Sequence, residues 1–545
     1  MSFLKWVLAS PVIVPVTLIT LVVSVVLLML EVHELRGRPV AAPHSAPVVA
    51  LDGAAQIETI FTALNMKETE IPVERVGSGG ALASLGNDLI VMTHEGGFFE
   101  AGGAEAKQLQ IAPPPNGWSA MLAFAEANPD YEFAHFFFRY NDVDVVDDQL
   151  IVSFTEWVEG ENCYRTAIST APLQGASAET ASIKAEDWTV LFGTEPCLAP
   201  NPEGRAIQGH MAGGRFRVDA NGTLFLAAGD YAQDGIYAPV PLSQIPDQMY
   251  GKVIAVDLAT GDSRVVSQGH SNMQGIALDQ DGKLWTVEHG RRGGDELNLI
   301  REGEDYGWPQ VSLGTRYNKL PLPDTLDYGR HPDFQLPAYS WLPSVAVSSL
   351  MNVDDFHPAW DGDLIAGSLA GNSLFRIRTN GESILFAERI PLGLRIRYVH
   401  QHGDELALWT DQRKVVRLTV GEFDPSFQFA VSKITDLELP ERKASAVETA
   451  LDGCAECHGF GVLPSTSAPS LGEVFGRQIA GLTDFDYSQS LSEVGGKWTR
   501  DQLVAFLDNP QSIAAETSMP DPALDDPEVV NAIVDILVSL REQAE

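Results

Sequence analysis

The most specific chemical signal in this chain is the pentapeptide Cys454-Ala455-Glu456-Cys457-His458. Two cysteines separated by two residues, followed at once by a histidine, can bond through sulfur to the vinyl groups of a haem while the imidazole binds its iron. A zinc site and a redox-active dithiol are the alternatives for such a pair. No second cysteine pair lies nearby to complete a zinc site, and no strand-helix-strand pattern favours a dithiol. The motif therefore predicts one covalently attached haem c and electron transfer.

The iron of such a haem takes a further ligand, usually a thioether sulfur or a second imidazole. Met519 lies 519 − 458 = 61 residues after His458, in the loop sequence Thr517-Ser518-Met519-Pro520. The chain around it resembles the class I cytochromes c over residues 444–545, in the stretches APSLG at 468–472, VFGR at 474–477, YS at 487–488 and WTRD at 498–501. The resemblance implies that His458 and Met519 both bind the iron; an ordinary loop methionine is the alternative reading of Met519.

The chain before residue 444 contains a repeated sequence pattern. Between about 60 and 420, a tight polar turn precedes four to six alternating or apolar residues, which are typical of a β-strand. The six turns are Asn87-Asp88, Asp147-Asp148, Asn221-Gly222, Asp281-Gly282, Asp361-Gly362-Asp363 and Gly403-Asp404. Six units that each need a neighbour to bury their faces predict a six-bladed β-propeller, in a mainly β chain with an all-α C-terminal domain. Two stacked β-sandwich domains are the alternative.

Part of this region resembles the glucose/sorbosone dehydrogenase family, the soluble-type quinoprotein sugar dehydrogenases. The matching stretches are GHMAGGRF at 209–216, LAAGD at 226–230, GHSNMQG at 269–275, VEHGRRGGDELNLI at 287–300 and DYGWP at 305–309. Weaker echoes follow at 343–349, 367–369 and 394–399. The resemblance implies a six-bladed propeller that uses pyrroloquinoline quinone (PQQ) and calcium to oxidise a sugar or alcohol.

The same resemblance assigns roles to particular residues. His210 matches the base that removes the hydroxyl proton while hydride goes to the quinone, and Asp230 matches the carboxylate that orients this base. Matches to cofactor and calcium ligands are Asn272 and Gln274 at the quinone, Arg395 and Arg397 as a clamp for its carboxylates, and the carbonyls of Gly290 and Arg291 at calcium. Taken singly, His210 would be a structural histidine and the two arginines surface ion-pair partners.

Two positions depart from the family pattern. Ser271 and Ala370 stand where the family has an arginine and a lysine, cations expected beside an anionic cofactor. Each lost charge-assisted contact weakens binding by ~1.5–3 kcal/mol. Four other cations are candidates to compensate: Lys252, Arg291, Arg292 and Arg376.

The chain is strongly acidic: 36 basic against 74 acidic residues leave a net charge of −38. This balance argues against nucleic acid, whose phosphates attract basic surfaces, and against docking on anionic lipid. Most of this charge reads as a solvated surface. It also favours a redox partner with a basic surface.

Residues 6–30 form 25 consecutive positions without a charge. A helix of that length spans roughly 37 Å, enough for a ~30 Å hydrocarbon core. The run predicts a single membrane anchor; a cleaved signal peptide is the alternative. Haem attachment in the resembled cytochromes takes place outside the bacterial cytoplasm, so we expect an inner-membrane protein with a cytoplasmic N-terminus and a periplasmic bulk.

The predicted organisation is an anchor at 1–37, a linker at 38–59, the propeller at 60–425, a second linker at 426–443 and the cytochrome at 444–545. Cys163 and Cys197 remain outside the haem motif and are either disulfide-bonded or two buried thiols. The predicted function is a membrane-anchored quinoprotein dehydrogenase that passes electrons from a sugar or alcohol through its own haem to a respiratory acceptor. The alternative is a non-catalytic propeller that serves as scaffold for a tethered cytochrome.

Overall fold

The computed structural model describes residues 49–51, 54–73, 79–175, 177–202, 205–236, 238–322, 330–422, 425–461, 468–482 and 485–544. The predicted anchor at 6–30 lies outside these residues, as does most of the linker before residue 49. Within the part that is described, no helix is both long and apolar enough to cross a membrane.

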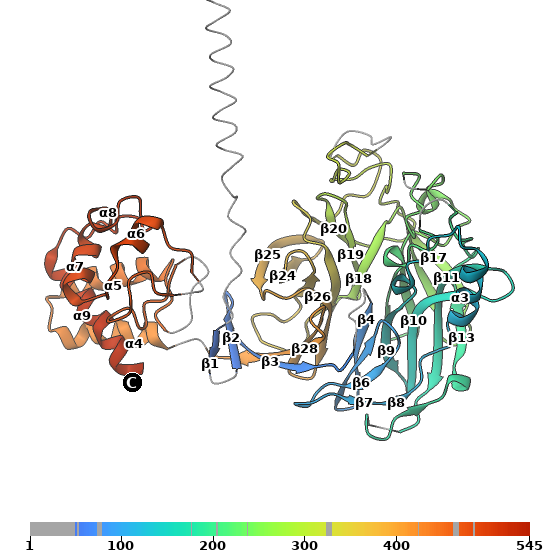
Figure 1. Ribbon diagram of the computed structural model, residues 1–545, viewed down its shortest axis with the longest axis horizontal. Coiled ribbons are helices and arrows are strands. Elements are labelled where there is room, and N and C mark those ends of the chain that lie inside the picture. The colour runs from blue at the N-terminus through green and yellow to red at the C-terminus, as the bar shows by residue number, and fades with distance from the viewer. Residues whose placement is uncertain are drawn as a thin grey trace, which may run out of the picture. The chain divides into compact units, whose positions relative to one another are not determined.

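Strands dominate the chain up to residue 421 and form the predicted six-bladed propeller (Figure 1). The first blade contains β4(Gly80–Leu85), β5(Asp88–Thr93), β6(Phe98–Glu100) and β7(Lys107–Gln108). The second contains β9(Tyr140–Val146), β10(Gln149–Val158), β11(Cys163–Pro172) and β13(Thr189–Gly193). The third contains β14(Gly213–Val218), β15(Thr223–Ala228), β16(Lys252–Asp257) and β17(Ser263–Gln268). The fourth contains β18(Asn272–Leu278), β19(Leu284–His289), β20(Asp295–Leu299) and β21(Tyr339–Trp341). The fifth contains β22(Val347–Asn352), β23(Leu364–Ser368), β24(Ser373–Asn380) and β25(Ser383–Pro391).

The sixth blade joins the two ends of the propeller sequence. Strands β26(Ile396–His402), β27(Glu405–Thr410) and β28(Lys414–Gly421) continue into β3(Ala63–Glu70), which pairs antiparallel with β28. Strands β1(Val49–Leu51) and β2(Ala54–Glu58) extend the same sheet, within the segment 38–59 that the sequence assigns to a linker. The first strands of the blades contact one another in the closed order β4, β9, β14, β18, β22, β26 and β4, so they surround the central channel.

The six turns found in the sequence all have one structural role. Each joins the innermost strand of a blade to the second strand, from β4–β5 through β26–β27. Several turn residues have positive φ, including Asp147 at 48° and Gly222 at 80°, as tight hairpins require. The second strands, such as β5 and β23, are apolar and buried because neighbouring blades cover both of their faces. Shorter elements in the connections between strands are β8(Gln110–Ile111), β12(Ser182–Ile183), α3(Trp118–Ala127), η1(His135–Phe137), η2(Ala185–Asp187), η3(Gly209–Met211) and η4(Leu242–Gln244).

A helical module follows the propeller. Its elements are α4(Ser426–Ser432), η5(Lys433–Leu437), α5(Glu441–Ala455), α6(Gln489–Val494), α7(Arg500–Asp508), α8(Pro510–Ile513) and α9(Pro527–Ala544). Apolar side chains of α9, including Val530, Ile533 and Leu537, pack in one core with Leu451 of α5. Ala430 of α4 belongs to the same core, although the sequence assigns residues 426–443 to a linker.

Cys163 and Cys197 form a disulfide, with Cα atoms 5.7 Å apart. Cys163 begins β11, and the neighbouring backbones pair where Tyr164 N donates to Leu198 O at 2.9 Å and Leu198 N donates to Tyr164 O at 2.8 Å. The cross-link therefore ties the chain after β13 to the second blade.

Replacing both Cys163 and Cys197 with serine should destabilise the propeller by about 3–4 kcal/mol, because the bond restricts a long loop in the unfolded chain. Thermal unfolding of the double variant against the parent protein measures this loss. Alkylation of the unfolded, unreduced holoprotein provides the matched control. It should label neither cysteine, and labelling of both would contradict the disulfide.

Candidate functional site

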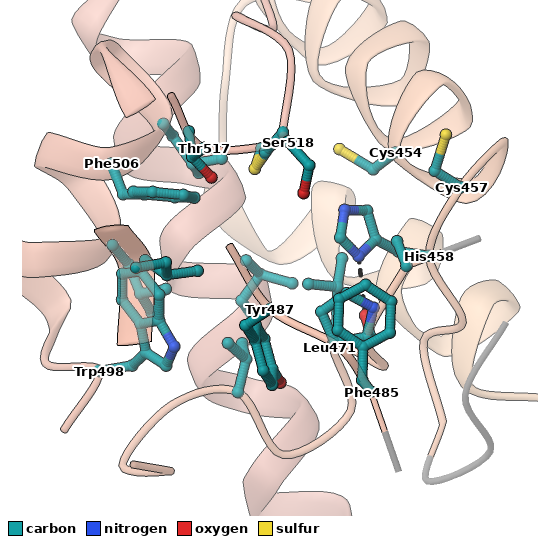
Figure 2. Close-up of a pocket in the computed structure, with 18 of the residues that line it drawn as sticks. Cys454, Cys457, His458, Leu471, Phe485, Tyr487, Trp498, Phe506, Thr517 and Ser518 are labelled. Atoms are coloured by element: carbon teal, nitrogen blue, oxygen red, sulfur yellow. Dashed lines mark hydrogen bonds between the residues drawn. The ribbon is translucent and has the colours of Figure 1, made fainter. Parts of the chain in front are cut away.

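The haem motif lies where α5 ends. Cys454 stands in the last turn of this helix, and His458 N donates to Cys454 O at 2.9 Å. Both cysteines and the histidine therefore lie within one tight turn. Figure 2 shows the two sulfurs beside the imidazole of His458, with Thr517 and Ser518 on the far side of the same pocket. Among the described residues, Cys454 and Cys457 belong to no cluster of three possible metal ligands.

His458 is oriented so that its Nε2 remains able to bind iron. Its Nδ1 lies 2.7 Å from the carbonyl oxygen of Pro469. A carbonyl can only accept, so Nδ1 carries the proton and Nε2 keeps its lone pair. Burial lowers the pKa of His458, which favours the neutral form that binds metals. Pro469 thus fixes both the tautomer and the direction of the ligand.

Met519 lines the same pocket as His458. Its loop is held from α8, because Gln511 Nε2 donates to Thr517 O at 3.2 Å and its Oε1 accepts from Glu516 N at 2.8 Å. The rest of the lining is largely apolar and includes Leu451, Phe460, Leu471, Trp498, Phe506 and Leu537. Two cysteines, an imidazole and a thioether around an apolar pocket fit a covalently attached haem.

Replacing Met519 with alanine should remove the sulfur–iron absorption band and lower the reduction potential of the haem, since a thioether ligand raises it. Met519→His should also lower the potential while keeping the iron six-coordinate. Spectra and a redox titration of both variants measure this. Ordinary spectra and an unchanged potential in Met519→Ala would show that another residue binds the iron.

The second candidate site lies on the propeller at His210, in the short helix η3 before β14. The ring of Phe137 covers one face of this imidazole, with centroids 4.2 Å apart. Burial lowers the pKa of His210 to about 3, and the positive charges of Arg139, Arg205 and Arg291 lower it further. The imidazole is therefore neutral at neutral pH and able to accept a proton. Its Nδ1 is buried and has no hydrogen-bond partner in the described part of the chain.

Asp230 does not provide that partner. Its carboxylate accepts from Trp308 Nε1 at 2.9 Å and from Ala232 N at 2.8 Å, and no hydrogen bond to His210 forms in this structure. Burial and the nearby Asp234 raise the pKa of Asp230 to about 7. Asp230 is thus a fully buried carboxyl close to the site, while the orienting contact implied by the family resemblance is not made.

Arg291 links several groups of this site. Its Nη2 lies 2.6 Å from Asp234 Oδ2, and its guanidinium lies 5.3 Å from the ring centre of Trp308. The side chain is only 10% exposed, and its charge acts on both His210 and Asp230. Of the four cations proposed to replace those missing at Ser271 and Ala370, Arg291 lies at the site.

The other three proposed replacements have different surroundings. Lys252 is buried and donates to the carbonyls of Leu242 and Ser243. Arg376 packs its guanidinium 5.0 Å from three aromatic rings and pairs with Glu388 at 2.8 Å. Arg292 pairs through its backbone with Thr315. These contacts hold local structure and point to no role at His210.

The two predicted amides form a continuous network with His289. Gln274 Nε2 donates to Asn272 Oδ1 at 2.7 Å, and Asn272 Nδ2 lies 3.4 Å from His289 Nδ1. His289 Nε2 lies 2.6 Å from Val347 O, so it must be the protonated nitrogen. Burial lowers the pKa of His289, in agreement with a neutral ring. The network fixes the amides of the first strand of the fourth blade.

Arg395 and Arg397 share one acidic partner. Arg395 Nε lies 2.8 Å from Asp411 Oδ2, and Arg397 Nε lies 2.5 Å from Oδ1 of the same carboxylate. Arg395 remains 45% exposed, whereas Arg397 is 14% exposed. The two guanidiniums therefore approach one carboxylate. Asp411 offsets part of the charge that they would offer to a carboxylate ligand.

The segment predicted to bind calcium is anchored by Asp295. This buried carboxylate accepts from Gly290 N at 2.9 Å, Ser344 Oγ at 2.6 Å, Val345 N at 2.9 Å and Ala346 N at 2.6 Å. It therefore fixes the turn that carries the carbonyls of Gly290 and Arg291.

Sequence reasoning missed Arg139 and Phe137, which precede β9. Arg139 is buried, its Nε donates to Asn141 Oδ1 at 2.9 Å, and its charge acts on His210 and on His94. Burial, and after it the positive charges of Arg215 and Arg397, lower the pKa of Arg139 to about 9. No motif marks these two residues, because their proximity to His210 arises only when the blades close.

A family model for glucose/sorbosone dehydrogenases matches residues 144–418, half of the chain. The aldose sugar dehydrogenase YliI of Escherichia coli is 30% identical over 242 residues, which cover 41% of this chain and 60% of that protein. A cytochrome c homologue of Rickettsia bellii is 37% identical over 89 residues in the C-terminal part, or 16% of this chain and 50% of its own. The chain thus covers 60% or less of the length of each of these two relatives.

A solved structure shares the fold. The crystal structure of a glucose dehydrogenase matches 65% of this chain and 99% of its own, with a TM-score of 0.50 and 26% sequence identity.

Proposed function

Because the chain belongs to the glucose/sorbosone dehydrogenase family, we propose that its propeller oxidises a sugar or alcohol and that its own haem receives the electrons. One observation carries this proposal. A neutral, half-buried histidine lies among cations on the propeller, in the same chain as two cysteines, a histidine and a methionine that line one pocket. A dehydrogenase with a fused cytochrome has a built-in route for the electrons that it removes.

The residues around His210 fit an anionic quinone such as PQQ. Arg139, Arg291 and Arg397 supply positive charge, and the buried Oγ of Ser271 and Nδ2 of Asn141 have no hydrogen-bond partner among the described residues. Unpartnered buried polar atoms favour a bound polar ligand at that place. When bound, the quinone would supply the two-electron acceptor for hydride.

His210 would act as the base in this reaction. Its neutral imidazole accepts the proton of the substrate hydroxyl as the adjacent C–H bond breaks and the carbonyl forms. Phe137 excludes water from one ring face, and the cations around the imidazole stabilise the negative charge that develops on the substrate oxygen. The carbonyls of Gly290 and Arg291 remain our proposed calcium ligands, because oxygen donors on a fixed turn suit this ion.

The haem module would then deliver electrons to an external acceptor. Residues 444–545 carry 4 basic and 17 acidic side chains, a net charge of 4 − 17 = −13. Such a surface attracts a partner with a basic face and speeds its association at low salt. A respiratory redox protein of that kind is our proposed acceptor.

The test is haem reduction by substrate. Full-length protein reconstituted with PQQ and calcium should show reduced haem when supplied with a suitable aldose or alcohol. His210→Ala should lower the rate by about 10²–10⁴-fold, the usual contribution of a general base, and leave the haem spectrum unchanged. His402→Ala, at the end of β26, is the matched control and should retain activity.

If no sugar or alcohol reduces the haem in the reconstituted protein, the dehydrogenase proposal falls. The propeller would then be a scaffold for the cytochrome, the alternative that the replaced cations at Ser271 and Ala370 favour. An active His210→Ala variant would instead support the dehydrogenase proposal and show that His210 is not its base.

We also propose that residues 6–30 anchor the chain in the bacterial inner membrane, with the bulk in the periplasm. The uncharged run of 25 residues supports this, as do the disulfide and the haem motif. The full-length protein should stay in the membrane fraction after an alkaline wash. A variant with a cleavable export signal in place of residues 1–37 should be soluble in the periplasm. Release of the full-length protein by the wash would contradict the anchor.

A further inference from the structure

Three side chains that can bind a metal lie together at the edge of the second blade. Glu161 stands in the turn between β10 and β11, Cys163 begins β11, and Cys197 follows β13. One carboxylate oxygen of Glu161 lies 3.5 Å from the sulfur of Cys197 and 3.9 Å from the sulfur of Cys163. Within the described residues, no other set of three His, Cys, Asp or Glu side chains brings its donor atoms within 4.8 Å of one another.

The backbone holds this cluster in place independently of the disulfide. Val158 pairs with Cys163 across the hairpin of β10 and β11, and Glu161 N donates to Val158 O at 3.3 Å within the turn. The two hydrogen bonds between the backbones of Tyr164 and Leu198 fix the residues that follow both cysteines. The three side chains therefore stay close to one another when the S–S bond is broken.

The distances suit a zinc ion. Tetrahedral zinc with Zn–S bonds of ~2.3 Å and Zn–O bonds of ~2.1 Å holds its ligand atoms roughly 3.6–3.8 Å apart. The Glu161 oxygen already lies near this distance from both sulfurs, so only the sulfurs must separate from each other. Thiolate sulfur also selects zinc over calcium and magnesium, which prefer oxygen ligands.

We propose that reduction of the Cys163–Cys197 disulfide turns Glu161, Cys163 and Cys197 into a zinc site. A dithiol reductant supplies two electrons and two protons: the S–S bond breaks, two thiols form, and the reductant itself becomes a disulfide. Zinc then binds both sulfurs as thiolates, and the two thiol protons pass to water. The Glu161 carboxylate is the third ligand and a water molecule the fourth, which completes a tetrahedron.

The zinc site maintains the connection that the disulfide makes. In either state the chain after β13 stays fastened to β11, so the segment that leads from Cys197 to His210 keeps a fixed start. Glu161 is exposed and Cys197 is half-buried, which gives the ion a route from solvent, whereas Cys163 is buried. A buried thiolate is costly without a partner, and the cation supplies one.

The test compares zinc binding by the oxidised and the reduced protein. Full-length, haem-loaded protein is used, since haem attachment occupies the sulfurs of Cys454 and Cys457. Dithiothreitol reduces one sample and is removed by gel filtration under nitrogen, and equilibrium dialysis with elemental analysis then measures zinc. The reduced protein should bind one more zinc ion per chain than the oxidised protein. Zinc should raise the midpoint of thermal unfolding more for the reduced form than for the oxidised form.

Substitutions identify the ligands. Glu161→Gln should weaken zinc binding by the reduced protein at least about tenfold, because even indirect contacts to a bound metal contribute that much. Glu159→Gln removes an exposed carboxylate from the same turn and is the matched control, which should bind zinc like the parent protein. The variant with serine at both Cys163 and Cys197 should not bind the additional zinc ion.

Three results would overturn the proposal. Equal zinc binding by the oxidised and reduced proteins would show that the cysteines do not contribute. Unchanged affinity in reduced Glu161→Gln, or a loss as great in Glu159→Gln, would remove Glu161 as a ligand. An additional zinc ion on the reduced protein that the double serine variant also binds would place the ion elsewhere.

Discussion

The pairing of β3 with β28 is the constraint on which the rest of the propeller depends. Eight residue pairs, from Ala63–Gly421 to Glu70–Lys414, join the start of the propeller sequence to its end. Without this pairing the last blade would have an open edge, and the ring of inner strands would not close. Closure also explains the location of the candidate site. His210 precedes β14, Asn272 begins β18 and Arg397 lies in β26, so three blades supply it.

Closure concentrates positive charge inside a strongly acidic protein. Arg139, Arg215 and Arg397 approach one another although buried like charges repel. Backbone acceptors offset part of this cost: Arg215 Nη1 donates to Gly80 O at 3.0 Å, and its Nη2 donates to Arg397 O at 3.2 Å. Carbonyl dipoles thus replace water around Arg215, while Arg139 donates to Asn141 Oδ1 and Arg397 pairs with Asp411. The arrangement leaves a local field that favours an anion, opposite in sign to the net charge of the chain.

Local sequence patterns predicted the features that depend on neighbouring residues along the chain. The polar turns marked every hairpin between first and second strands, because positive φ restricts which residues can stand there. The approach of Cys454, Cys457 and His458 to one another has the same origin, since their spacing along one short segment determines it. Contacts between separate strands and loops were not predictable in this way. Asp411 between Arg395 and Arg397, and Phe137 on His210, depend on distances that no single segment encodes.

The cations around His210 connect cofactor binding with base strength under the proposed function. Burial and three arginines keep the pKa of His210 near 3, so the imidazole is neutral but a weak base. An anion bound among the same arginines would offset their charge and raise this pKa toward the working pH. Proton removal would then become efficient only when the electron acceptor is in place. The departures at Ser271 and Ala370 fit this arrangement, because Arg139 and Arg291 supply positive charge on the side of the site where His210 stands.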